Sequence, residues 1–232
     1  MKLVGDPGAD PVYVEQYRRL GTALHHAQVR DGIRTVMVAS AVANEGKTLS
    51  ATNLALTLSR SFSKRVLLID GDLRRPSVHQ LLHIENRDGL SSILKHPDAG
   101  FAPQTLSSTL SVITSGDPDP DPVALLVSDA AGRLLSDVSA RFDWVVVDTP
   151  PVVLFPDAEI FAGRLDRCVM VVNAAKTASP VAAQAVATIG ASRILGVVLN
   201  RAEAGEISAG YGYGYGYGYG ASSDAASEGG RR

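Results

Sequence analysis

Residues 41–48 (AVANEGKT) form a loop of mostly small residues that ends in a lysine and a threonine, directly after a short apolar run. The backbone N–H groups of such a loop can converge on one anion, and the dipole of a following helix favours negative charge there. Lys47 would then bridge the β- and γ-phosphates of a nucleotide, and the Thr48 hydroxyl would ligate Mg²⁺. The alternative is a chance turn before a helix. We predict a phosphate-binding loop whose nucleotide contacts are Ala43, Asn44, Glu45, Gly46, Lys47, Thr48 and Leu49.

Two other apolar runs end in carboxylates. The run in LLIDGDLRRP delivers Asp70 and Asp72, followed by Arg74 and Arg75, and the run WVVVD ends at Asp148. Two acids at positions i and i+2 can share a metal ion or a proton-transfer task, although a solvated turn would also accommodate them. A carboxylate that ends a buried strand is costly unless it is paired or bound to metal. We therefore expect Asp148 to hold Mg²⁺, directly or through water.

A further polar residue, Asn200, ends the run ILGVVLN. Its amide offers a donor and an acceptor, which suits the edge of a purine. A turn residue at this position is an equally good interpretation, and the sequence leaves both open.

Tyrosines gather near the C-terminus. Five of the seven alternate with glycine in GYGYGYGYGYG, namely Tyr211, Tyr213, Tyr215, Tyr217 and Tyr219. Glycine makes the backbone easy to thread into a narrow site, one phenol at a time; an adhesive, aggregation-prone segment is the alternative. The eleven residues from Asn200 to Tyr211 reach at most about 36–40 Å, so a tail tyrosine could enter its own subunit's site or a neighbour's.

The elements that must position these residues follow a repeating order. Short β-rich runs alternate with stretches long enough for helices, which indicates an α/β fold with a mostly parallel sheet covered on both faces. Ligands of such folds bind at the carboxyl ends of the strands, where the motifs above fall. The expected strands are 35–39, 66–69, 110–113, 144–147, 168–172 and 194–199, and the expected long helices are 48–61, 123–139 and 180–191.

The two ends of the chain and one loop differ from this pattern. Residues 11–28 have apolar side chains at helical spacing and predict an amphipathic helix, which Gly21 weakens by about 1 kcal/mol relative to alanine. Residues 115–122 (SGDPDPDP) can form neither helix nor central strand. We expect one domain over residues 1–204 and a disordered tail over 205–232, because the tail is too poor in apolar residues to fold.

Composition excludes several classes of protein. A formal net charge of −2 without a basic stripe gives no basis for nucleic-acid binding. The single cysteine, Cys168, lies in an apolar run and is expected to pack in the core of a protein from a reducing, cytoplasmic compartment. No signal peptide and no run of about 20 apolar residues is present, so we expect a partner to supply any attachment to a membrane.

Together and in this order, AVANEGKT, LLIDGDLRRP, VVVDTPP and the tyrosine cluster resemble the bacterial tyrosine kinases of capsule and exopolysaccharide synthesis. The resemblance implies a P-loop NTPase fold, ATP and Mg²⁺ as cofactors, and autophosphorylation of the five tail tyrosines. It implies that Asp70 receives the tyrosyl proton and that Asp72 and Asp148 organise the metal together with Thr48. It also implies that Arg74 and Arg75 stabilise charge or position the tail.

The same resemblance implies partners. These are a transmembrane polysaccharide co-polymerase that activates the kinase at the inner face of the membrane, a tyrosine phosphatase, and further copies of the chain. Members of the family self-associate through an E-x-x-R-x-x-R pattern on the first helix. Glu15 and Arg18 match this pattern, but Gly21 replaces its last arginine, so we expect weaker assembly. Two other departures are Ala124 in place of a glutamate and Asn173 in place of an arginine.

Two other functions fit part of the sequence. One is a non-kinase ATPase switch, a class that usually carries a second lysine where this chain has Val42 and that lacks a tyrosine cluster. The other is an inactive nucleotide-binding scaffold of a polysaccharide assembly machine, against which the intact Lys47, Asp70 and Asp148 argue.

Overall fold

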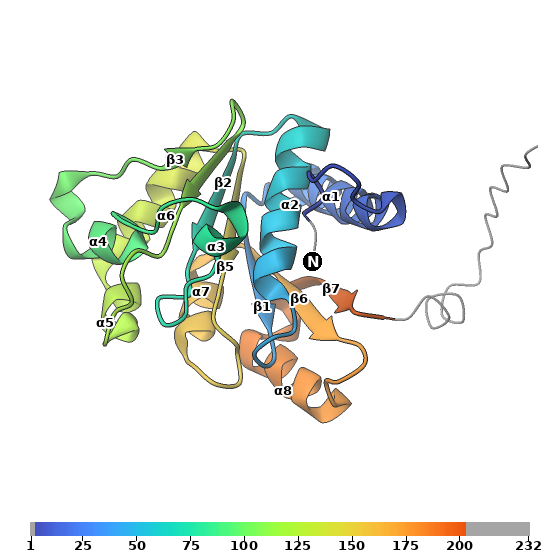
Figure 1. Ribbon diagram of the computed structural model, residues 1–232. Helices are drawn as coiled ribbons and strands as arrows, with labels where there is room; N and C mark the ends of the chain where they lie inside the picture. Colours follow the sequence, from blue (N-terminus) through green and yellow to red (C-terminus); the bar gives the residue numbers. More distant parts are fainter. Residues whose placement is uncertain (1–2, 203–232) are drawn as a thin grey trace, which may run out of the picture. The chain divides into compact units, whose positions relative to one another are not determined.

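A single sheet of seven strands forms the centre of the fold in our computed structural model, which describes residues 3–202. The strand order is β3-β4-β2-β5-β1-β6-β7, and all neighbours are parallel except β3 and β4 (Figure 1). The α/β fold with a mostly parallel sheet is therefore confirmed. The strands are β1 (Thr35–Ser40), β2 (Val66–Asp70), β3 (Gln104–Thr105), β4 (Leu110–Ile113), β5 (Trp144–Asp148), β6 (Arg167–Asn173) and β7 (Ile194–Asn200).

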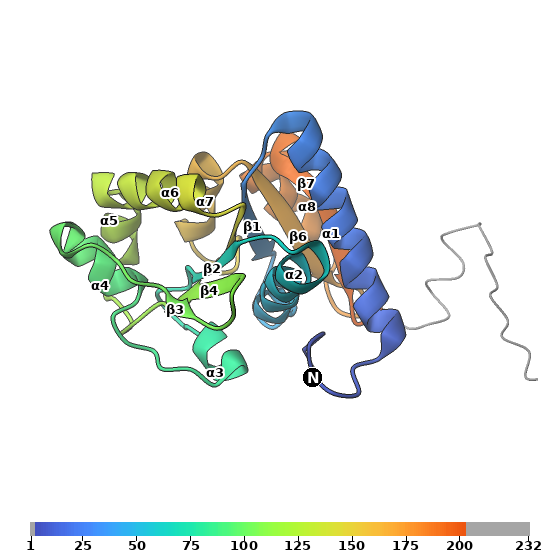
Figure 2. The same ribbon diagram turned by 90° about the horizontal axis from the view of Figure 1, so that it is seen from above.

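Helices cover both faces of this sheet. Figure 2 shows α1 and α2 on one side of it and α6 and α7 on the other. The helices are α1 (Pro11–Asp31), α2 (Lys47–Phe62), α3 (Val78–Leu82), α4 (Leu90–Lys95), α5 (Pro122–Val127), α6 (Asp129–Arg141), α7 (Asp157–Arg164) and α8 (Ser179–Ile189), with short 3₁₀ turns at Pro97–Ala99 and Ala191–Arg193.

The core is divided by the sheet into two layers. Alternate residues of a strand point to opposite faces, so Val36 and Val38 of β1 join the layer under α1 and α2, while Met37 and Ala39 join the layer under α4 to α8. Cys168 is buried in the second of these layers, as its apolar surroundings in the sequence predicted.

Helix α1 is three residues longer than the predicted helix 11–28 and ends where Gly32 takes a left-handed conformation with φ 70°. Gly21 lies on its buried face. A Cβ atom at this position would come within 2.6 Å of the Phe62 ring at the end of α2. An arginine there would therefore have to displace Phe62, which occupies the space next to the helix.

Some sequence predictions were wrong in detail. The single helix expected over 123–139 is two helices, because Ser128 has extended backbone (φ −62°, ψ 157°) and its hydroxyl caps α6 by accepting from the Ala131 N–H at 3.4 Å. The elements β3, α3, α4 and α7 were missed, since elements of two to eight residues are too short to show a clear period. Pro122, placed in the proline-rich loop, begins α5. The predicted tail 205–232 lies outside the described residues.

Candidate functional site

The loop predicted to bind phosphate joins the end of β1 to the first turn of α2. Its path requires two residues with positive φ, Asn44 at 65° and Gly46 at 97°. Asparagine tolerates this region better than most residues. Gly46 has a second reason to be glycine, because a Cβ atom would come within 2.1 Å of the Asn200 side-chain nitrogen. The tip of the loop, Ala43 and Asn44, is exposed to solvent.

Glu45 supports this loop from inside. Its side chain is only 1% exposed, and one carboxylate oxygen accepts a hydrogen bond from the Val42 N–H at 2.8 Å. The other oxygen accepts from the Asn173 N–H at 3.1 Å and from the Thr177 hydroxyl. The carboxylate thus ties the start of the loop to the turn after β6, leaving the backbone of Glu45 as the part that could meet a ligand. The sequence offered no signal for this supporting role.

Lys47 lies among three carboxylates at the ends of β2 and β5. Its Nζ is 3.3 Å from Asp148 Oδ1, 3.4 Å from Asp72 Oδ2 and 3.4 Å from the Thr48 hydroxyl, and the side chain is buried. Burial alone would lower the pKa of the amine, but the surrounding carboxylates, Asp148 first, raise that pKa above its ordinary value. Lys47 therefore stays charged in this site. Leu49, two residues further along α2, is buried, so it could meet a ligand only through its backbone.

Asp70 and Asp148 are paired in register at the ends of β2 and β5. Both are fully buried. Asp70 accepts hydrogen bonds from the Ser77 and Val78 N–H groups, each at 3.0 Å. Burial, with the adjacent Asp148 charge, raises the pKa of Asp70 to about 7. Burial also raises the pKa of Asp148, and the Lys47 ammonium and the Thr48 hydroxyl oppose that rise.

The residue after Gly71, Asp72, shapes the segment that follows it. One oxygen accepts from the N–H groups of Arg74 (3.3 Å) and Arg75 (2.9 Å), while the other faces Lys47. The Arg74 side chain turns away to Asp157, with Nε 3.2 Å and Nη2 3.1 Å from Oδ2, and its guanidinium stacks over Phe155 at 4.4 Å. Arg74 thus neutralises a fully buried carboxylate that the sequence did not single out for any role. Arg75 is exposed.

Asn200, at the end of β7, reaches the phosphate-binding loop. Its side-chain NH₂ donates to the Glu45 carbonyl at 2.7 Å, and its side-chain oxygen accepts from the Arg201 N–H at 3.0 Å. The structure thus brings the predicted residues Lys47, Thr48, Asp70, Asp72, Asp148 and Asn200 together at the carboxyl ends of the strands. The predicted acceptor tyrosines 211–219 lie outside the described residues.

The chemistry available here is that of an anion-binding loop beside a cation and three acids. The backbone of the loop and Lys47 can receive phosphate groups, while oxygen donors on the opposite side can hold a hard metal ion or a proton.

Known proteins that resemble this chain include P-loop NTPases and tyrosine kinases. Residues 33–208 match the ParA family model, described as NUBPL iron-transfer P-loop NTPase. The tyrosine-protein kinase YwqD of Bacillus subtilis is 38% identical over 190 residues, which cover 80% of each chain.

The chain belongs to the bacterial tyrosine kinases of capsule and exopolysaccharide biosynthesis.

Other relatives of this kinase are consistent with that assignment. The tyrosine-protein kinase wzc of Salmonella typhi is 37% identical over 170 residues, which are 72% of this kinase and 23% of that protein. Among solved structures, the chimerical protein CapA2B2 has a TM-score of 0.78 at 29% identity and covers 86% of this kinase and 88% of that chain. The kinase domain of the Escherichia coli tyrosine kinase ETK has a TM-score of 0.73 at 29% identity, covering 87% and 80%.

The family assignment distinguishes the kinase from the non-kinase switch. The kinase is a tyrosine-protein kinase and a P-loop nucleotide-binding protein, as its motifs predicted, and the non-kinase switch is not supported. Within residues 3–202, no helix is long and apolar enough to cross a membrane.

Proposed function

We propose that this kinase transfers the γ-phosphoryl group of ATP, with Mg²⁺, to the five tyrosines of its Gly–Tyr segment. The observation that carries the proposal is the position of Lys47, within 3.4 Å of Asp72 and Asp148 and beside the paired Asp70, at the end of the strand-loop-helix unit. Phosphoryl transfer needs little covalent chemistry from the protein and depends on positioning and charge. The acceptors are Tyr211, Tyr213, Tyr215, Tyr217 and Tyr219.

Asp70 would accept the proton of the tyrosine hydroxyl. A general base works best when its pKa lies near the working pH, and burial raises the pKa of Asp70 to about 7. The Ser77 and Val78 N–H groups fix one of its oxygens at 3.0 Å, so its carboxylate is oriented.

The oxygen donors at this site fit Mg²⁺. This ion is usually held by one or two carboxylates together with substrate phosphates rather than by a cage of protein ligands. Thr48, Asp72 and Asp148 would supply the protein's share, and among residues 3–202 no group of three or more His, Cys, Asp or Glu is placed to hold a metal ion by itself. The bound ion would neutralise charge on the phosphates. Lys47, which Asp72 and Asp148 hold in place, would do the same from the loop side.

Arg74 and Asn200 would contribute to phosphoryl transfer by positioning other parts of the site. Arg74 positions the segment after Asp72 by pairing with Asp157, and Asn200 holds the loop on the nucleotide side of the site. The Asn200 side chain already bonds to the Glu45 carbonyl through its NH₂ group and to the Arg201 N–H through its oxygen. A contact with the purine would use the second hydrogen of the NH₂ group or the second lone pair of the oxygen.

We also propose where the kinase works. It would act in the cytoplasm at the inner face of the membrane, with a transmembrane polysaccharide co-polymerase as activator and a tyrosine phosphatase as antagonist. Two findings support a partner that works together with the kinase domain. The matched part of wzc is only 23% of that protein, and a similar solved structure is the chimera CapA2B2. Self-association would use α1, weakened by Gly21.

The decisive experiment is incubation with ATP and Mg²⁺ followed by trypsin and mass measurement of the peptide that begins at Ala202. We expect one to five additions of about 80 Da on this peptide. The matched control is Lys47→Met, which should remove at least nine tenths of the signal. A folded, nucleotide-binding wild-type protein whose tail stays unmodified would disprove the proposal.

A further inference from the structure

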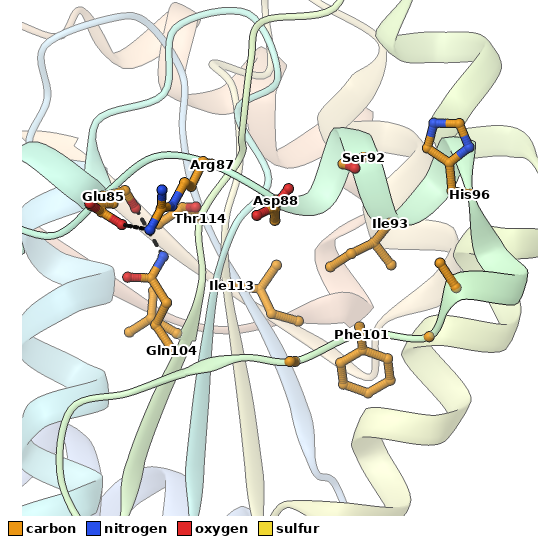
Figure 3. A pocket seen from close by; sticks show the side chains of 14 residues that line it. Glu85, Arg87, Asp88, Ser92, Ile93, His96, Phe101, Gln104, Ile113 and Thr114 are labelled. Atoms are coloured by element: carbon orange, nitrogen blue, oxygen red, sulfur yellow. Dashed lines mark hydrogen bonds and ion pairs between the residues drawn. The ribbon is translucent and has the colours of Figure 1, made fainter.

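A cavity of about 440 Å³ lies at the edge of the sheet, beside the site described above and separate from it. It forms where β4 continues beyond its short partner β3. The segment 85–93 gives one wall and the segment 99–104 the other, as Figure 3 shows. The proposed function uses none of the residues that line it.

The two ends of this cavity differ in chemistry. Ile93, Phe101 and Ile113 lie toward one end, where Ser92 and His96 are beside Ile93, and Thr114, Gln104 and the Glu85–Arg87 ion pair lie toward the other (Figure 3). A ligand with an apolar body and a polar tip matches such a division.

Thr114 supplies the second observation. Its side chain is 1% exposed, and its hydroxyl has no hydrogen-bond partner within the described part of the chain. Buried hydroxyl groups almost always have a partner, because an unpaired one is costly. An incoming hydroxyl at this end of the cavity would provide the missing partner.

The charges at the rim limit what can enter. The Arg87 guanidinium is already paired with Glu85 at 2.6 Å, and Asp88 adds a further carboxylate to the lining. A phosphate group would face these acids, and the one arginine among the described residues of the lining is already paired. The cavity therefore suits a neutral phenol better than a phosphotyrosine.

We propose that this cavity docks one unmodified tyrosine of the Gly–Tyr segment 210–220 from a second copy of the chain. This inference rests on the proposed function, in which the same segment is the substrate. The segment carries five of the seven tyrosines and follows β7. In the sheet, β7 and β4 are five strands apart, or about 24 Å. The tail of the same chain would have to pass around the helices that cover the sheet to reach this cavity, whereas the tail of a second copy can approach it directly.

The cavity is close enough to Asp70 for a tyrosine anchored in it to set the position of another tyrosine of the same segment. Ile69 pairs with Ile113, so Asp70 and Thr114 are the next residues on neighbouring strands, whose backbones lie about 5 Å apart. One Gly–Tyr repeat spans about 7 Å when extended. A tyrosine anchored in the cavity would thus hold a tyrosine one or two repeats away near Asp70. A row of five tyrosines lets each serve as anchor or as acceptor.

Photo-crosslinking tests the docking without any phosphoryl transfer. Phe101 is replaced by p-benzoylphenylalanine in the full chain, which is dephosphorylated and mixed with an equal amount of ¹⁵N-labelled wild-type chain before irradiation and trypsin digestion. We expect position 101 to capture the peptide that begins at Ala202, with about half of the captured peptides carrying ¹⁵N if copies mix freely. The same crosslinker in place of Val29, which is 74% exposed near the end of α1 and lies at the amino ends of the strands, is the control and should not capture it.

The outcomes separate the possible errors. Capture of only unlabelled tails would overturn the second copy as the source, and capture of no tail would overturn the docking itself. Neither result depends on ATP, so a failure here with normal autophosphorylation leaves the proposed function standing.

A pair of variants tests the predicted hydroxyl contact. Thr114→Val keeps the shape and removes the hydroxyl, and it should slow tail phosphorylation at low protein concentration about fivefold, the usual effect of one hydrogen bond. Thr105→Val, on exposed β3 outside the cavity, should have no effect. Nucleotide affinity should be equal in both variants, which shows that the phosphate loop is intact. Equal phosphorylation rates for the two variants would overturn the assignment of Thr114.

Discussion

The side chain of Asn200 donates a 2.7 Å hydrogen bond to the carbonyl of Glu45, 155 residues earlier in the chain. The last strand thereby holds the phosphate-binding loop at the position where Gly46 leaves room for it. The geometry of the loop depends on β7 as well as on the strand that precedes it.

We expect Asn200→Asp to weaken nucleotide binding, because the new carboxylate cannot donate to the Glu45 carbonyl and would repel it. Loss of the hydrogen bond and an unpaired carbonyl should lower the free energy of unfolding by about 1–3 kcal/mol. Urea denaturation and nucleotide titration measure both effects. Asn200→Ala, which loses the bond without adding charge, should show the smaller loss. Unchanged nucleotide affinity in both variants would mean that the loop holds its shape without β7.

Glu45→Gln should also disturb the loop. The carboxylate accepts from three donors, the Val42 and Asn173 N–H groups and the Thr177 hydroxyl, and a glutamine NH₂ group cannot accept. At least one buried donor then loses its partner, at a cost of about 1–3 kcal/mol. The matched variant Thr177→Val removes one donor and leaves the carboxylate in place. If Glu45→Gln unfolds at the same urea concentration as the wild type, the network contributes nothing.

The raised pKa of Asp70, about 7 against an ordinary 3.8, predicts a pH dependence of stability in the protein without nucleotide and Mg²⁺. Between these values the unfolded chain has released the proton and the folded chain retains it, so the unfolded state binds fewer protons. Stability therefore falls as pH rises from about 4 to about 7, and this contribution is constant outside that window. Asp70→Asn should gain stability relative to the wild type across the window.

Thermal unfolding at several pH values measures this difference. Asp117→Asn, in an exposed loop, is the control and should follow the wild type. If Asp70→Asn also runs parallel to the wild type, the pKa of Asp70 is not raised. The same Asp70→Asn variant should lose most autophosphorylation at every pH, since an asparagine cannot accept the tyrosyl proton.

Gly21 predicts weak self-association. The position is buried against Phe62, and the charged side chain of the family pattern is missing. We expect the unphosphorylated protein to be a monomer or small oligomer at micromolar concentration in light scattering. The double variant Gly21→Arg with Phe62→Ala, which makes room for the arginine, should raise the assembly state, and Phe62→Ala alone should not. A large stable oligomer of the wild type would contradict this prediction.

We expect phosphorylation of the tail to weaken tail binding and assembly through electrostatic repulsion. Each phosphotyrosine adds about −1.5 to −2 charges, so five add roughly −7 to −10, and Asp70, Asp72 and Asp148 at the site would repel them. Changing all five tyrosines to phenylalanine should lock whatever assembly exists, because the tail can no longer gain charge, and changing all five to glutamate should loosen it. Sedimentation with Mg²⁺ and a non-hydrolysable nucleotide compares the two. Identical profiles would make the tail a passive substrate.

The sequence by itself determined the sheet and which polar residues gather at the carboxyl ends of its strands. Apolar runs that bury both faces predicted six of the seven strands, and the residues at their ends, such as Lys47, Asp70 and Asp148, had to meet because parallel strands end at one edge. Family membership followed from the order of the same motifs.

Tertiary structure decided how those residues are used. No local pattern shows that Glu45 faces inward, that Arg74 neutralises Asp157, or that Asn200 holds the loop, because each contact joins segments far apart in the chain. The cavity beside Thr114 has the same origin: it exists because β3 is only two residues long and leaves the end of β4 uncovered. Periodicity fixes which face of an element is buried, whereas partners and empty space depend on how separate elements pack together.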